Sequence, residues 1–142
     1  LTSLYFQFGR YLLISSSRPG CMPANLQGIW AQGLEPPWNS DYHININIQM
    51  NYWPSEITNL SETHMPFLKF IGKLREKGRE TAKEIYGVNG FTAHHTTDAW
   101  HWTTPFGQPQ YGMWPMGAAW ASTHLWEHYL FTEDQEFLKK YG

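Results

Sequence analysis

Cysteine, charged residues and long apolar runs are all scarce in this chain of 142 residues. The single cysteine, Cys21, excludes an internal disulfide framework and a zinc site built from several cysteines. No run of eighteen apolar residues occurs, so the sequence predicts no membrane-spanning helix. Ten basic and twelve acidic side chains give a net charge of -2. Because binding to nucleic acid needs a basic surface, this balance argues against a nucleic-acid partner.

Aromatic residues, by contrast, are abundant. Eight Trp, eight Tyr and eight Phe make up 17% of the chain, whereas charged residues make up only 15%. This composition suits a large shared core, or a groove that binds flat apolar faces such as those of a sugar ring. The length is that of one ordinary domain. The sequence does not begin with Met, its first residues do not have the pattern of a signal peptide, and we expect both ends to be cut from a longer protein.

The spacing of apolar and turn residues predicts five helices. They are expected at about residues 2–16, 49–58, 61–86, 115–131 and from about 132 onward. Pro54 is expected to lie near the start of the second helix or to kink it.

The ends of two helices are predicted from capping residues. In the helix at 61–86, Ser61 is the expected N-cap and Gly87 the stop. Its inward-facing residues are expected to be Met65, Leu68, Leu74 and Ile85. The last helix is expected to begin with a capping box formed by Thr132 and Gln135.

The long connections at about 17–46 and 87–112 contain many of the Pro, Gly, His and Trp residues. Loops of this length in a compact domain are functional or disordered. Trp30 and Trp38 argue against disorder in the first of them. Helices joined in this way predict an all-α fold, a helical toroid whose loops at one end build a site.

Polar residues occupy every second position of the stretch DYHININIQMNYWP, residues 41–54: His43, Asn45, Asn47, Gln49 and Asn51. The residues between them are apolar: Ile44, Ile46, Ile48 and Met50. Alternation of this kind is the period of an extended segment, with the polar set on one face. Asn is a poor strand former, so a polar face of His and carboxamides indicates a function beyond solubility.

A second group of candidate residues lies in the segment FTAHHTTDAWHW, residues 91–102. His95, Asp98 and Trp100 are candidates for one wall of a sugar pocket, in which an aromatic ring packs on C–H groups and polar groups bind hydroxyls. The alternative is a turn in which Asp98 caps N–H groups and the histidines bond to the backbone. Trp114 is a similar candidate, and core packing explains it equally well.

Residues 124–128 read HLWEH, which matches the H-x-x-E-H signature of a zinc peptidase. On a helix, His124 and His128 share a face and would bind zinc, with Glu127 as the base. The motif is short and no third ligand is evident, so a buried, hydrogen-bonded pair of histidines is the favoured alternative.

Residues 15–54, together with residues 93–100 and 113–134, resemble the catalytic domain of the glycoside hydrolase family 95 α-L-fucosidases. The most specific motifs are RPGxxPANLQGIW (residues 18–30) and NINxQMNYWP (residues 45–54). The resemblance implies an exported enzyme, periplasmic or extracellular, that removes terminal α-L-fucose from fucosylated glycans with inversion. It also implies an (α/α)6 barrel of twelve helices, so residues 1–142 would be a partial barrel, with the rest of the barrel from downstream sequence.

The resemblance places the water-holding Asn pair of that family on Asn45 and Asn47, and its sugar-binding His on His43. An amide oxygen orients water but is too weak a base to deprotonate it. The acid and base carboxylates would lie downstream, so we expect the isolated chain to be inactive. No metal or other cofactor is needed. Helix capping or bonding to loop backbone remains an alternative role for both asparagines.

Three other functions remain open at this stage. An α-L-galactosidase on the same scaffold would need a more polar pocket wall, because a hydroxyl is disfavoured against apolar side chains. The others are a zinc peptidase and a non-catalytic fragment that binds sugar.

Overall fold

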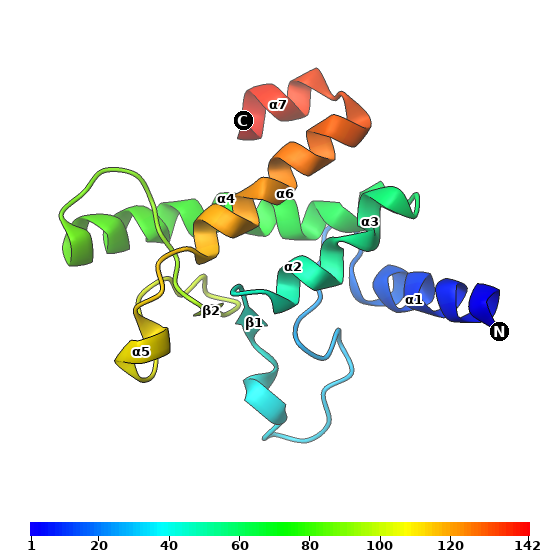
Figure 1. The fold of residues 1–142 in the computed structure, drawn as a ribbon, viewed down its shortest axis with the longest axis horizontal. Helices are drawn as coiled ribbons and strands as arrows, with labels where there is room; N and C mark the ends of the chain where they lie inside the picture. Colours follow the sequence, from blue (N-terminus) through cyan, green and yellow to red (C-terminus); the bar gives the residue numbers. More distant parts are fainter.

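The computed structural model describes residues 1–142 as helices joined by long loops, with one small sheet (Figure 1). The helices are α1 (Thr2–Ser16), α2 (Asn47–Tyr52), α3 (Pro54–Ile57), α4 (Ser61–Tyr86), α5 (Pro109–Gly112), α6 (Gly117–Thr132) and α7 (Gln135–Tyr141), and η1 (Pro37–Ser40) is a 3-10 turn. The strands β1 (Tyr42–His43) and β2 (Thr96–Thr97) pair antiparallel. The mostly helical content agrees with the expected all-α class. The (α/α)6 barrel stays a prediction.

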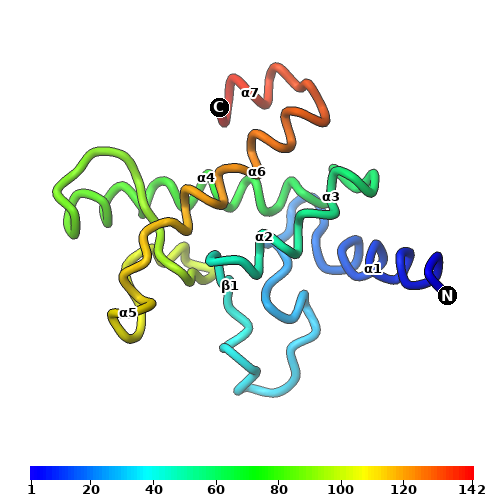
Figure 2. Tube along the Cα trace, in the orientation of Figure 1, coloured from blue at the N-terminus to red at the C-terminus, as the bar shows by residue number.

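Helix α4 is the centre of the fold. Helix α6 crosses it, and α2 and α3 lie beside its first half (Figure 2). The apolar residues of α4 recur at helical spacing and bury one face completely: Phe67, Leu68, Phe70, Ile71 and Leu74. The opposite face, rich in Lys, Arg and Glu, is exposed as expected. The two long connections meet where β1 pairs with β2.

The long helix has the predicted bounds, but two details of the prediction were wrong. Gly87 ends α4 in a left-handed conformation with φ of 66°, as expected. Ser61 is the first helical residue and not the cap; the N-cap position is Leu60, which has no side-chain hydrogen bond to the helix. Ile85 is 41% exposed, because it lies beyond Ala82, the last buried residue of the helix.

The last helix begins with a different cap from the expected one. Thr132 is the final residue of α6, and its hydroxyl donates to the carbonyl of His128. Asp134 caps α7 and accepts the N–H groups of Glu136 and Phe137 at 2.9 and 3.0 Å. One carboxylate therefore satisfies two free N–H groups, which makes the predicted capping box unnecessary.

The helix predicted at about 49–58 is divided in two. It starts two residues early, at Asn47, and breaks between Tyr52 and Pro54, because proline has no N–H to continue the helix. Helix α6 starts at Gly117, two residues later than predicted. The short helix α5 lies in a connection that was expected to be irregular throughout.

The extended interpretation of residues 41–54 was wrong beyond His43. Only Tyr42 and His43 form a strand, and the chain turns into α2 by Asn47. Ile44 and Ile48 are fully buried, as expected. Residues four apart lie on the same face of a strand and also on the same face of a helix, so both patterns place these two side chains together. Ile46 and Met50 lie on the other side of this segment and are 40% and 53% exposed to solvent.

Helix α1 leaves one face of the molecule apolar and exposed. Helix α1 buries only Leu13 and Ser16, while Leu4, Tyr5 and Phe8 are each more than half exposed. None of the helices combines the length and the apolar character that crossing a membrane requires.

Candidate functional site

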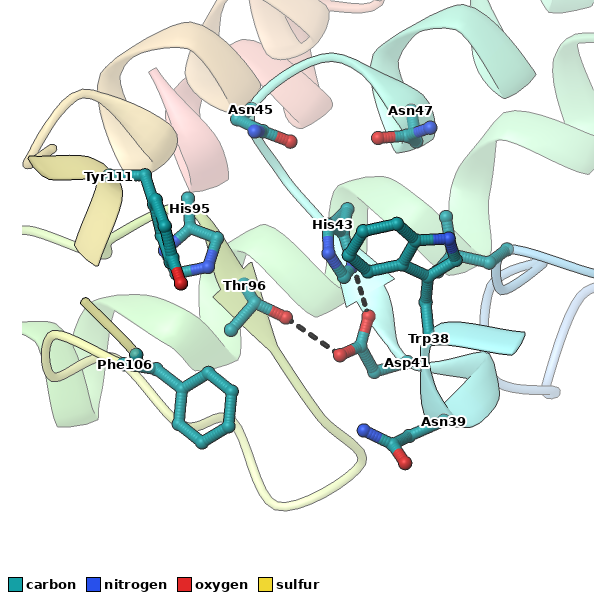
Figure 3. A pocket seen from close by; sticks show the side chains of 12 residues that line it. Trp38, Asn39, Asp41, His43, Asn45, Asn47, His95, Thr96, Phe106 and Tyr111 are labelled. Atoms are coloured by element: carbon teal, nitrogen blue, oxygen red, sulfur yellow. Dashed lines mark hydrogen bonds and ion pairs between the residues drawn. The ribbon is translucent and has the colours of Figure 1, made fainter. Parts of the chain in front are cut away.

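A cavity of about 630 Å³ opens where β1, β2 and the start of α2 meet the two long loops. Its size lies in the range of small-molecule sites, about 300–1,000 Å³. It is lined by Leu26, Trp38, Asn39, Asp41, His43, Asn45, Asn47, His95, Thr96, Phe106, Gly107 and Tyr111. Most of these side chains are labelled in Figure 3.

The two short strands bring the walls of the cavity together. Tyr42 pairs with Thr97 and His43 with Thr96, and the Ile44 N–H donates to the His95 carbonyl at 2.8 Å. The two segments are more than fifty residues apart in sequence. This pairing therefore sets the position of His43 relative to His95.

Close packing of the start of α6 holds this pairing in place. A Cβ on Gly117 would lie 2.3 Å from the His94 carbonyl oxygen and 2.6 Å from Ile44 Cδ1. Only glycine permits so close an approach. The glycine thus lets α6 pack directly behind the wall of the cavity.

Four aromatic rings follow one another along the cavity wall. The His43 ring lies edge-on to Trp38, with ring centres 5.7 Å apart, and edge-on to His95 at 6.0 Å. His95 in turn lies edge-on to Tyr111 at 5.8 Å. Edge-to-face contacts at these distances are favourable, so the row is a preformed wall with apolar faces and polar edges.

Asn45 and Asn47 lie together at one end of the cavity, where Figure 3 shows their amide oxygens pointing toward each other. Both residues are exposed to solvent. The alternative role of helix capping is not seen, because the N-cap of α2 is Ile46 and the helix has no side-chain cap. Both amides therefore remain available to a ligand.

The cavity carries no Lys or Arg, and Asp41 is the one carboxylate that lines it. Burial and the neighbouring His43 lower the pKa of His95, so its ring is neutral near pH 7. The ring's buried Nδ1 has no hydrogen-bond partner in the chain. Such a surface suits a neutral ligand with several hydroxyl groups better than a charged one.

The structure places the other predicted residues outside this cavity. Asp98 accepts the N–H groups of Trp100 and Trp102 at 2.9 and 3.2 Å, which is the turn-capping alternative. Trp100 is 82% exposed, and Trp114 packs edge-on against Trp120. The predicted sugar contacts of Asp98, Trp100 and Trp114 thus gain no support here.

Several lining residues were missed by the sequence analysis. Asp41 could have been predicted from the sequence, because it lies two residues before His43 in an extended segment and so points to the same side. Thr96, Phe106 and Tyr111 come from the other long loop, and no local pattern indicates that they face His43. The position of the Trp38 side chain depends on three consecutive residues with left-handed backbone conformation, residues 38–40, which no sequence pattern predicts.

A separate group of histidines surrounds Glu56 in the core between α3, α4 and α6. His64 Nδ1 donates to Glu56 Oε1 at 2.7 Å, and His128 Nδ1 donates to the same oxygen at 2.6 Å. His124 lies 2.9 Å from the other nitrogen of His64. These side chains are all buried.

Hydrogen bonds determine the charges in this cluster. Burial alone would raise the pKa of Glu56, but hydrogen bonds from His128, His64 and Ser61 outweigh it and lower that pKa to about 2. Burial lowers the pKa of His64, and burial together with His64 lowers that of His124 to about 3. The cluster thus holds a carboxylate with two neutral imidazoles, those of His64 and His124.

The predicted buried pair of histidines on α6 is confirmed, and the zinc-peptidase alternative is not favoured. The ligand atoms of Glu56, His64 and His128 lie within 4.8 Å of one another, a spacing at which such residues can hold a metal. Glu127, however, is exposed to solvent, whereas Glu56 and the three histidines are buried. It has no side-chain hydrogen bond to the cluster, so the role of base predicted for it gains no support.

Comparison with known proteins gives one consistent result. The profile of the glycosyl hydrolase family 95 catalytic domain matches residues 1–142. "Alpha-L-fucosidase 2" of Arabidopsis thaliana is 52% identical over 100% of this chain and 17% of its own length. "Probable alpha-fucosidase A" of Aspergillus niger is 38% identical over 99% of this chain and 18% of its own length. The chain thus spans less than a fifth of these relatives, and it belongs to glycosyl hydrolase family 95.

Proposed function

We propose that this chain is part of an α-L-fucosidase that removes terminal α-L-fucose from fucosylated glycans with inversion. The observation that carries the proposal is the pair of free amides, Asn45 and Asn47, whose oxygens face each other in a cavity of suitable size. The relative named "Alpha-L-fucosidase 2", which is similar to the whole of this chain, supports the same activity.

Two facing amide oxygens can hold one water molecule between them: one accepts a hydrogen of the water, and the other shares the second hydrogen with a base. The oxygen lone pairs of that water are then directed away from the amides, toward an anomeric carbon bound beside them. An amide is too weak a base to take the proton, so a carboxylate must do so as the C–O bond forms. In an inverting mechanism a second carboxyl group protonates the leaving oxygen from the other side of the sugar.

Asp41 is unsuited to be that base although it lines the cavity. Its Oδ1 accepts a hydrogen bond from His43, and its Oδ2 accepts one from the Thr96 hydroxyl at 2.9 Å. Both oxygens are thus already engaged in holding His43 and Thr96. We therefore expect both catalytic carboxylates to come from parts of the protein beyond this chain, and the isolated chain to show no turnover.

The apolar rings of the wall favour fucose over its 6-hydroxy analogue, L-galactose. Trp38, Phe106 and Tyr111 offer ring faces against which the methyl group of fucose can pack. The 6-hydroxyl of L-galactose would lack a hydrogen-bond partner against such a face. This feature supports an α-L-fucosidase above the α-L-galactosidase alternative.

The remaining helices of an (α/α)6 barrel would come from the rest of the protein. The exposed apolar side chains of α1, including Leu4, Tyr5 and Phe8, form the kind of surface that packs against such helices. The partner proposed for this face is therefore the remainder of the same catalytic domain.

The test uses the full-length protein and aryl α-L-fucoside and α-L-galactoside substrates. We expect the fucoside to be hydrolysed faster, and proton NMR of the first-formed product to show β-L-fucose, the inverted anomer. First-formed α-L-fucose would rule out the inverting mechanism. Faster hydrolysis of the galactoside would rule out the specificity.

A further inference from the structure

The Asp41 carboxylate connects the two strands of the site through its two oxygens. His43 Nδ1 bonds to Oδ1, and the Thr96 hydroxyl donates to Oδ2 at 2.9 Å, as the dashed lines in Figure 3 show. Asp41 and His43 flank Tyr42 on β1, and Thr96 is the β2 partner of His43. The carboxylate therefore cannot rotate without breaking one contact or the other.

The backbone of Asp41 is held as firmly as its side chain. Its carbonyl accepts the N–H of Leu26 at 3.1 Å, and its own N–H donates to the Trp38 carbonyl at 3.4 Å. The side chains of Asp41 and His43 are only 18% and 17% exposed. Partial burial of this kind strengthens a hydrogen bond to a carboxylate.

The contact decides which nitrogen of His43 carries the hydrogen. A carboxylate accepts hydrogen bonds and does not donate them, so Nδ1 must be the protonated nitrogen. In the neutral ring Nε2 is then an acceptor. Trp38 and His95 pack against the ring on two sides and oppose its rotation.

We propose that Asp41 is a positioning residue that holds His43 in its Nδ1–H form, with Nε2 presented to the cavity as the acceptor for a sugar hydroxyl. Thr96 supports this role by bonding to the second carboxylate oxygen. The proposal rests on the function proposed above, since it takes the ligand of His43 to be a sugar. Without Asp41, the ring is free to take the other tautomer and offer a donor where the hydroxyl needs an acceptor.

A double-mutant cycle in the full-length protein tests this role. Asp41→Ala, His43→Ala and the double variant are compared by kcat and KM on an aryl α-L-fucoside. We expect each single variant to lower kcat/KM by about 10- to 100-fold, mainly through KM, because each removes the correctly oriented acceptor for the sugar hydroxyl. The double variant should fall within about twofold of His43→Ala, because Asp41 acts through His43.

A pair of threonine variants provides a matched control that keeps the carboxylate. Thr96→Val removes the hydroxyl bonded to Asp41, whereas the neighbouring buried Thr97 has a hydroxyl without a partner. We expect Thr96→Val to raise KM severalfold and Thr97→Val to leave KM unchanged. Equal effects of the two valine variants would show a general effect on the strands and overturn the proposal. The proposal would also be overturned if the loss of kcat/KM in the double variant equalled the product of the losses in Asp41→Ala and His43→Ala.

A neutron structure of the full-length protein separates this inference from the proposed function. Deuterium on Nδ1 of His43 and none on Nε2 supports the inference whatever the substrate is. Deuterium on Nε2 alone overturns the inference even if the protein hydrolyses fucosides. A protein that lacks fucosidase activity but carries deuterium on Nδ1 would contradict only the function.

Discussion

At the scale of single residues, the buried cluster around Glu56 is the most constrained feature outside the cavity. One carboxylate oxygen accepts two imidazole N–H groups, and the far nitrogen of His64 accepts from His124. The chain of bonds ends at His124 Nε2, which is buried and has no partner. Each ring therefore has a defined tautomer, and the cluster joins α3, α4 and α6.

Replacing Glu56 by Ala should lower the free energy of unfolding by about 2–4 kcal/mol, since it leaves two buried N–H donors without an acceptor. Chemical denaturation measures the change. The matched control is Glu127→Ala, whose side chain is exposed on the same helix as His128, and its effect should stay within about 0.5 kcal/mol. Equal effects of the two substitutions would contradict the role of the cluster.

The same cluster makes stability depend on pH. Glu56, His64 and His124 all have a lower pKa in the folded state than in the unfolded state. The unfolded chain therefore binds more protons below about pH 6.5, the ordinary pKa of histidine, and stability falls as the pH drops toward about 3. Denaturation midpoints from pH 8 to pH 4 should show this decline, and His124→Phe should make it less steep. A flat profile would show that the histidines are not held neutral.

At the scale of elements, the approach of α6 to the two strands depends on Gly117. The next smallest residue would place a methyl carbon 2.3 Å from a backbone oxygen, so the start of α6 would have to move away from β1. Gly117→Ala should therefore destabilise the protein by about 1–3 kcal/mol and reduce activity. Thermal unfolding and kcat/KM measure the two effects.

Gly9 in α1 is the control for that substitution. A Cβ at Gly9 meets nothing within 4 Å, and the residue lies within a helix. Gly9→Ala should stabilise the protein by about 0.5–1 kcal/mol, because alanine restricts the unfolded chain. A loss of stability at both glycines would mean that the effect at Gly117 is not a steric one.

The elements also show what could be predicted from sequence. The long helix was predicted with its bounds because its apolar face and Gly87 are local signals. The strand beyond His43 was predicted wrongly, because Ile44 and Ile48 satisfy both the strand period and the helix period. The predicted caps Ser61 and Thr132 were wrong, because the N-cap of α4 is Leu60 and that of α7 is Asp134.

At the scale of the whole molecule, the candidate site is assembled from two loops that are distant in sequence. His43, Asn45 and Asn47 were found from one short stretch, together with His95 from the other loop. Thr96 became evident only when the pairing of β1 with β2 was known, whereas Asp41 could have been found from its spacing to His43. Contacts between distant segments are set by the register of those strands and by packing at Gly117, neither of which leaves a local pattern.

The measurement that tests the proposed role of the asparagine pair most directly is the turnover of Asn45→Ala and Asn47→Ala in the full-length protein. Both variants should lower kcat on an aryl α-L-fucoside by about 10²- to 10⁴-fold while KM changes by less than about threefold, since the held water matters in the transition state. Asn89→Ala, an exposed position away from the cavity, should leave both constants unchanged. A kcat that stays at the wild-type value in both cavity variants would contradict the role of Asn45 and Asn47 in holding the attacking water.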